Sequence, residues 1–140
     1  MKSLNIETEL RIDTDGDVWR FDLMQREERL GWLHAVRTGG RLLLGDIVLE
    51  NLKYKGQGIG RRLLDAFVKT AQEEGISEVW GSVTQEDIQQ TPYLLDWYQR
   101  LGFTISDPDE ECVHTAAKKI VLKLKSGERD RPTDCLPQAE

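Results

Sequence analysis

The chain has 140 residues, with 19 Lys and Arg against 25 Asp and Glu, so its net charge is −6. A hydrophobic fraction of 39% and a charged fraction of 31% are typical of a folded protein, and the length is that of one domain. The acidic excess argues against a nucleic-acid-binding protein, because phosphate neutralisation requires a surplus of cations. No stretch approaches the ~20 apolar residues of a membrane span.

The N-terminal segment and the cysteines predict a cytoplasmic protein. The first seven residues contain one Lys but no apolar core, so they do not resemble a signal peptide. The sequence has two cysteines, Cys112 and Cys135, and without a secretion signal these are expected to stay reduced. Cys112 and His114 have a spacing that can bind a metal, but one pair is not a site, so no metal is predicted.

Alternating apolar residues predict three strands in the first third of the chain, over 4–12, 18–24 and 30–36. The segment 13–17 contains Asp-Gly between two alternating runs, which favours a hairpin. A calcium-binding loop is the alternative for these acids, but the glycine comes too early and no Glu closes the loop.

The middle of the chain predicts a strand, a glycine-rich joint and a helix. Residues 42–52 form a nearly continuous apolar run, as expected of a central strand covered on both faces. The joint over 53–60 leads into a helix in which apolar residues recur at every fourth position. Gly75 would end this helix at about residue 74.

The last third predicts a short strand over 79–83, a second helix from Thr91-Pro92 to residue 101, and strands over 103–105 and 117–124. The fold class is therefore α/β (α+β), with about seven strands in a mixed, mostly antiparallel, twisted sheet and a parallel crossover around the first helix. Residues 1–125 would form one domain, and 126–140 a polar, flexible tail.

The glycine-rich joint is the most informative segment for function. The first N–H groups of a helix lack internal partners, and the helix dipole adds partial positive charge there. Glycines let a ligand approach the backbone, so the joint suits an anion such as a phosphate. Arg61 and Arg62 in the first turn fit an anion site, although they could simply be solvated. The glycine spacing fits neither a Walker loop nor a dinucleotide fingerprint.

The joint and a later segment resemble the GNAT acetyltransferase superfamily. Lys55-Gly56-Gln57-Gly58-Ile59-Gly60 looks like its acetyl-CoA loop, Arg/Gln-x-x-Gly-x-Gly/Ala, with Lys at the leading position. The segment Trp97-Tyr98-Gln99-Arg100-Leu101-Gly102-Phe103 is similar to the helix-to-strand segment of the family. The two motifs occur in the family's order, one helix and one strand apart.

The resemblance implies an N-acetyltransferase that uses acetyl-CoA as co-substrate and acts on a primary amine by direct attack. The pantetheine arm would lie between the strands over 42–52 and 79–83. Tyr98 matches the tyrosine that protonates the departing CoA thiolate in many members, and its structural alternative is a packed aromatic. The cofactor-binding residues that the resemblance implies are Val48, Leu49, Leu52, Lys55, Gly56, Gln57, Gly58, Ile59, Gly60, Arg61 and Arg62.

Four carboxylates are candidates for the acceptor side. Glu50 ends the central strand, where family members often carry a general base, although it could be a solvated edge residue. Asp46 is expected to be buried in the same apolar run and ranks below Glu50. Glu86 and Asp87 follow the fifth strand and more simply form a solvated loop.

The chain departs from the family between its first two strands. Most members carry two helices there that line the acceptor site, whereas this chain has only the turn over 13–17. The acceptor pocket should then be shallow, or completed by a second subunit or a loop near 86–91.

A non-catalytic acyl-CoA-binding or protein-interaction module on the same fold is the alternative function. The predicted partners are acetyl-CoA and an amine, with a possible homodimer and with neither nucleic acid nor membrane.

Overall fold

The structure is a computed structural model that describes residues 8–50 and 52–124. Part of the first predicted strand and the predicted tail over 126–140 lie outside the described residues. The strands are β1 (Glu9–Asp13), β2 (Val18–Gln25), β3 (Glu28–Thr38), β4 (Arg41–Leu49), β5 (Glu78–Thr84), β6 (Thr104–Ser106) and β7 (Ala116–Lys123). The helices are the short 3-10 turn η1 (Leu52–Tyr54), α1 (Ile59–Glu73), α2 (Gln85–Gln90) and α3 (Leu94–Arg100).

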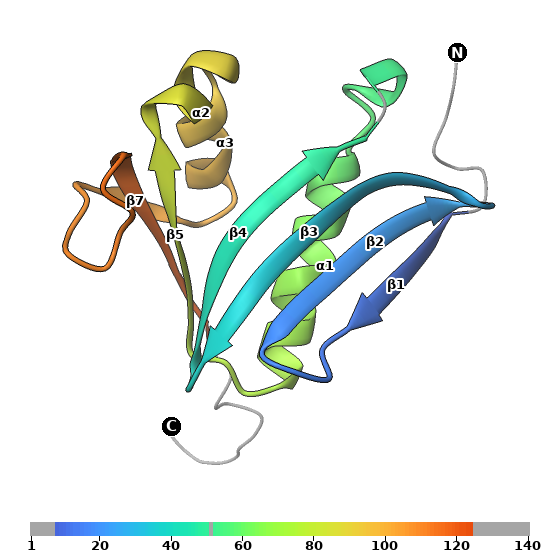
Figure 1. Cartoon of the computed structure of the whole chain (residues 1–140), viewed down its shortest axis with the longest axis horizontal. Coiled ribbons are helices and arrows are strands. Elements are labelled where there is room, and N and C mark those ends of the chain that lie inside the picture. The colour runs from blue at the N-terminus through green and yellow to red at the C-terminus, as the bar shows by residue number, and fades with distance from the viewer. Residues whose placement is uncertain (1–7, 51, 125–140) are drawn as a thin grey trace.

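The seven strands form one mixed sheet in the order β1-β2-β3-β4-β5-β7-β6 (Figure 1). The β4–β5 pair is parallel and the other neighbouring pairs are antiparallel. This confirms the predicted fold class, including the parallel connection through α1. None of the helices in the described part of the chain is both long and apolar enough to cross a lipid bilayer.

The core lies between α1 and one face of the sheet. The predicted periodicity of α1 is confirmed, because Ile59, Leu63, Phe67 and Ala71 are all buried. The Phe67 ring packs edge-on against Trp19 and Phe21 of β2, with ring centroids 6.4 and 5.7 Å apart. Burial of this helical face fixes α1 across β2, β3 and β4, and so fixes its N-terminus above the end of β4.

A glycine lets the start of α1 approach the sheet closely. A Cβ atom on Gly31 of β3 would lie 2.7 Å from the Val48 carbonyl oxygen and 2.8 Å from the Cγ2 atom of Ile59. These distances are shorter than real side chains allow, so a larger residue would push α1 outward. Gly31 therefore sets the height of the glycine-rich joint above the sheet.

The other face of β2, β3 and β4 carries no helix among the described elements, and we call it the open face (Figure 1). The expectation that the central strand is covered on both faces is therefore wrong. Leu42 and Leu44 are buried against α1, but Leu43 is only half-buried and Asp46 is exposed. The physical reason is the short β1–β2 hairpin, which provides no helix between these two strands to cover this face.

The segment predicted as a loop before the second helix forms a helix of its own, α2, and the predicted helix over 91–101 corresponds to α3. Thr84 and Asp87 form a capping box, in which Asp87 N–H donates to Thr84 Oγ1 and Thr84 N–H donates to Asp87 Oδ2. This capping starts α2, which ends at Gln90, and Thr91 is its C-terminal cap. The predicted helix start at Thr91-Pro92 is therefore wrong, and α3 begins at Leu94 without a side-chain cap.

An ion cluster joins the loop before β7 to the base of the β4–β5 pair. Its members are Arg41, Glu78, Asp109, Glu111 and Lys119. Arg41 donates to both carboxylate oxygens of Glu111 at 2.9 Å and to Glu78 at 2.8 Å. Its guanidinium and the Lys119 ammonium lie 5.2 and 5.3 Å from the centre of the Trp80 ring. The cluster thus anchors the loop across the sheet.

Replacement of Glu111 by Gln should lower the stability of the folded protein at neutral pH but not at very low pH. Hydrogen bonds from Arg41 and Lys119 hold the pKa of Glu111 at about 2, below its ordinary value of 4.5. The stabilisation is therefore present above pH 4.5 and is lost as the pH falls towards 2. Urea midpoints at pH 5 and pH 2 should show a wild-type advantage that shrinks with acid. An advantage that is equal at both pH values would contradict this assignment.

Candidate functional site

A cleft opens where β4 and β5 separate. The two strands pair only over residues 41–43 and 78–80, near their beginnings. Beyond these pairs lies a cleft of about 660 Å³, with walls from β4, the glycine-rich joint, β5, α2 and α3. In β4, Gly45 has no partner in the β3 register, which pairs His34 with Asp46 and Ala35 with Leu44. Such a bulge bends its strand, here at the point where β4 leaves β5.

Most of the predicted cofactor-binding residues line this cleft. They are Val48, Leu49, Lys55, Gly56, Gly58, Ile59, Gly60 and Arg61, and Tyr98 lines it as well. Gln57 and Arg62 are not among the lining residues, and the side chain of Leu52 lies outside the description. The cleft thus brings together the two segments that carry the sequence motifs.

The glycine-rich joint presents backbone N–H groups to the cleft. Gly56 and Gly58 have φ angles of 83° and 80°, and a Cβ on either would meet no atom within 4 Å. Gly58 is the N-cap of α1 and provides no side-chain cap, so the first N–H groups of the helix remain available. The Gln57 N–H is already used, because it donates to the Tyr54 carbonyl at 3.2 Å. The N-terminus of α1 is thus an open anion-binding position.

The two arginines of the first turn point to different places. Arg61 lines the cleft and forms an ion pair with Asp65 at 3.1 Å. Arg62 instead donates a hydrogen bond to the Thr8 hydroxyl beside β1. Only Arg61 is therefore placed to meet a ligand at the start of α1.

Tyr98 is buried at the side of the cleft formed by α3. Its side chain is only 8% exposed, and it packs edge-on against Trp97 and Phe103 with ring centroids 5.2 Å apart. Burial raises the pKa of the Tyr98 hydroxyl to about 12, and the nearby charges of Asp87 and Asp46 add to the increase. The phenol therefore keeps its proton at any physiological pH and can donate it or share it in a hydrogen bond.

The carboxylates of the cleft are Asp46 from β4 and Asp87 from α2. The expected burial of Asp46 is wrong, since the open face leaves it exposed. Glu50 does not line the cleft, and its carboxylate accepts a hydrogen bond from Arg29 at 2.8 Å. Its predicted role as a base stays a prediction. Sequence reasoning passed over Asp87 as loop, although the Thr-x-x-Asp capping pattern at 84–87 could have revealed the helix that positions it.

The raised pKa of Tyr98 predicts a loss of stability in alkali that depends on this residue. Below pH 10 the group is neutral in both the folded and the unfolded chain, so it adds no pH dependence. Between pH 10 and 12 an unfolded tyrosine ionises but Tyr98 does not, which favours unfolding by up to about 2–3 kcal/mol. Denaturation midpoints at pH 9 and pH 11.5 should fall more for the wild type than for Tyr98→Phe. Equal falls in both proteins would show that the pKa is not raised.

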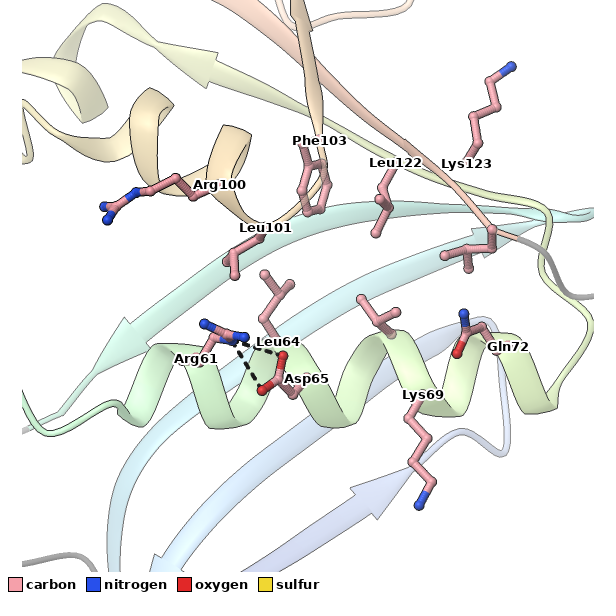
Figure 2. Close-up of a pocket in the computed structure, with 12 residues that line it drawn as sticks. Arg61, Leu64, Asp65, Lys69, Gln72, Arg100, Leu101, Phe103, Leu122 and Lys123 are labelled. Atoms are coloured by element: carbon pink, nitrogen blue, oxygen red, sulfur yellow. Dashed lines mark hydrogen bonds and ion pairs between the residues drawn. The ribbon is translucent and has the colours of Figure 1, made fainter.

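A second cavity, of about 450 Å³, lies along α1 on the side of α3 and β7. Figure 2 shows Leu64, Leu101, Phe103 and Leu122 directed towards its interior, while Lys69, Arg100 and Lys123 point outward at its rim. Arg61 lines both this cavity and the cleft. The two hollows therefore meet at the N-terminus of α1.

Trp97 also lines the cleft. It belongs to the second sequence motif, which gave it no role in the predicted site. A Cβ on Gly60 would lie 3.7 Å from the Trp97 ring, so the ring rests on the first turn of α1. This contact sets the distance between α1 and α3.

Within the described residues, no three His, Cys, Asp or Glu side chains meet as metal ligands would.

Comparisons with known proteins agree with this geometry. A family model described as an acetyltransferase (GNAT) domain matches residues 20–105, and the chain therefore belongs to the GNAT acetyltransferase family. No curated protein matches the sequence.

Several solved structures share the fold. The PaiA N-acetyltransferase of Thermoplasma acidophilum, solved with coenzyme A, is 18% identical with a TM-score of 0.64, over 77% of this chain and 62% of that one. The ribosomal-protein-S18-alanine N-acetyltransferase of Escherichia coli is 19% identical with a TM-score of 0.62, over 85% and 77%. A Bacillus subtilis acetyltransferase, also solved with CoA, is 13% identical with a TM-score of 0.62, over 84% and 99%.

Proposed function

We propose that the cleft binds acetyl-CoA and that the protein transfers its acetyl group to a primary amine. The observation that carries this proposal is the single cleft that joins an open helix N-terminus to a buried, protonated tyrosine. An anion site and a proton donor at two ends of one cleft match a ligand with phosphates at one end and a thioester at the other. Membership of the GNAT family supports the same conclusion.

The cofactor is oriented by the backbone of two segments. Its pyrophosphate lies on the N–H groups that begin α1, with Arg61 beside it. The pantetheine arm extends along Val48 and Leu49, where β4 has no strand partner on its β5 side and its backbone groups are free. The adenosine end leaves the cleft past Arg61 towards the second cavity, whose rim is cationic.

In the reaction, the amine nitrogen attacks the thioester carbonyl carbon, so that a C–N bond forms and the C–S bond breaks. The attacking amine must be neutral, and the proton of its ammonium form passes to a carboxylate. Asp46 is better placed for this step than Glu50, because it lines the cleft and Glu50 is paired with Arg29. Tyr98 donates its proton to the departing thiolate, and the nitrogen, which is positively charged once the C–N bond has formed, releases a proton that restores the phenol.

The test is transfer of labelled acetyl groups from acetyl-CoA to amines. The panel contains alkylamines, arylalkylamines, diamines, amino sugars and lysine-containing peptides at millimolar concentration, and mass spectrometry follows both free CoA and acetylated product. We expect equal amounts of CoA and an acetylated amine from at least one class. Tight binding of acetyl-CoA with no transfer to any class would instead support the alternative function, an acyl-CoA-binding module without turnover.

A further inference from the structure

Flat side chains stand in a row along β3 on the open face. The rings of Trp32 and His34 are stacked with centroids 4.3 Å apart and planes inclined by 32°. The Arg29 guanidinium lies over the Trp32 ring, 5.9 Å from its centre. We call Arg29, Trp32 and His34 the ring row. Both aromatic residues are half-buried, so part of their surface remains open to a ligand.

The ring row lies beside the edge of the cleft. In the β3–β4 register His34 is opposite Asp46, and Trp32 is opposite Val48. Asp46 and Val48 both line the cleft. The Asp46 carboxylate is also close enough to Tyr98 to act on the pKa of its hydroxyl. The end of the row is therefore next to the place where the acetyl group would be transferred.

Asp46 differs from the acids beside the ring row in having no cation. Asp22 and Glu50 are both paired with Arg29. In the described part of the chain, Asp46 forms neither an ion pair nor a side-chain hydrogen bond. An exposed carboxylate at the edge of a cleft, with no cation of the protein paired to it, attracts a positively charged ligand.

A buried polar atom indicates that a bound molecule completes this region. The Nε2 atom of His34 is buried and has no hydrogen-bond partner within the described residues. The Tyr98 side chain, 8% exposed, lies in the wall of the adjoining cleft. Buried polar atoms without partners are uncommon in folded proteins and are often satisfied by ligands or water.

We propose that the acceptor is a primary amine joined by a short alkyl chain to a flat apolar group, with the ammonium at Asp46 and the flat group packed against the ring row. This inference rests on the proposed function and specifies its substrate class. Side chains directly opposite on antiparallel strands are about 5 Å apart and diagonal neighbours about 7–8 Å. These spacings, from Asp46 to His34 and to Trp32, correspond to a linker of about two or three carbons.

The test compares three amines in the labelled-acetyl assay: phenethylamine, its saturated analogue cyclohexylethylamine, and butylamine. The first two have the same linker and similar size, but only phenethylamine has a flat aromatic ring. We expect kcat/KM for phenethylamine to exceed that for cyclohexylethylamine about fivefold, the usual gain from one aromatic contact. Butylamine, which has no ring to pack against the row, should be the poorest of the three.

The matched variants are Trp32→Leu and Val36→Ala. Val36 is on the same face of β3, 41% exposed, and one step farther from Asp46 than His34 is. Trp32→Leu should raise KM for phenethylamine about fivefold while kcat and the KM for butylamine stay unchanged. Val36→Ala should change none of these values. Acetyl-CoA affinity, measured on each variant, confirms that the fold is retained.

The outcomes separate this inference from the function on which it rests. Transfer to all three amines with equal kcat/KM, or a Trp32→Leu effect equal for phenethylamine and butylamine, would overturn the proposed acceptor class and leave the acetyltransferase intact. Acetyl-CoA binding without transfer to any amine would overturn the proposed function itself, and the acceptor class with it. The aromatic preference together with its loss in Trp32→Leu supports both.

Discussion

Replacement of Tyr98 by Phe should lower kcat by about a hundredfold or more and leave the affinity for acetyl-CoA unchanged. Positioned acids contribute about 10²–10⁴-fold to proton-transfer steps. Tyr98 is a protonated acid in the described cleft wall, and its hydroxyl is not needed to hold α3, because its ring makes the packing contacts with Trp97 and Phe103. Steady-state kinetics with the best acceptor and calorimetry with acetyl-CoA measure the two parameters separately.

Tyr54→Phe is the matched control for this experiment. Tyr54 is also buried, but its hydroxyl donates to Gln25 Oε1 at 3.3 Å. Its loss should change kcat by less than about threefold, the effect of one neutral hydrogen bond. If Tyr98→Phe behaved like this control, Tyr98 would be a packing residue and another group would protonate the thiolate.

Replacement of Gly58 by Val should weaken acetyl-CoA binding by about a hundredfold. With φ at 80°, a β-branched residue costs about 1–3 kcal/mol in backbone strain. The side chain would also occupy the open space over the glycine, where a phosphate must approach the backbone. The affinity should fall because the first N–H groups of α1 can no longer converge on the anion.

Gly39→Val provides the control for backbone strain alone. Gly39 lies in the turn between β3 and β4 with φ at 64°, and its Cβ would also meet no atom within 4 Å. Both variants should lose similar stability in urea denaturation, about 1–3 kcal/mol. Only Gly58→Val should lose affinity for acetyl-CoA. An equal loss of affinity in both would mean that the glycine loop does not hold the phosphates.

Local patterns predicted the fold well where one face of an element is buried. The four-residue spacing in α1 and the alternation in β2 identify their buried sides, because each packs against the same core. Prediction failed where one pattern had two structural meanings. The apolar run over 42–52 indicates a strand buried on both faces, but the open face makes half of β4 accessible, and only tertiary structure shows what covers a strand.

The candidate site was predictable in its cofactor half and less so in its acceptor half. Glycines at positive φ and an uncapped helix start leave a clear sequence signature at 56–60. Whether Asp46 or Glu50 is the better placed to accept a proton from the amine depends on the separation of β4 from β5 and on the ion pair of Glu50 with Arg29. No local sequence pattern shows either feature. The proposed role of the Trp32–His34 stack likewise depends on the position of Asp46 opposite His34, which only the pairing of β3 with β4 shows.

The most direct test of the central claim is calorimetric titration of the protein with acetyl-CoA, with ATP and NAD as controls. The account predicts one site per chain for acetyl-CoA and for CoA, and much weaker binding of ATP and NAD, whose phosphates lack the pantetheine arm that fills the β4–β5 cleft. A thermal shift should accompany binding, since a ligand at 100 times its Kd adds about 2.7 kcal/mol of stability. No binding of acetyl-CoA, or binding no tighter than that of NAD, would contradict it.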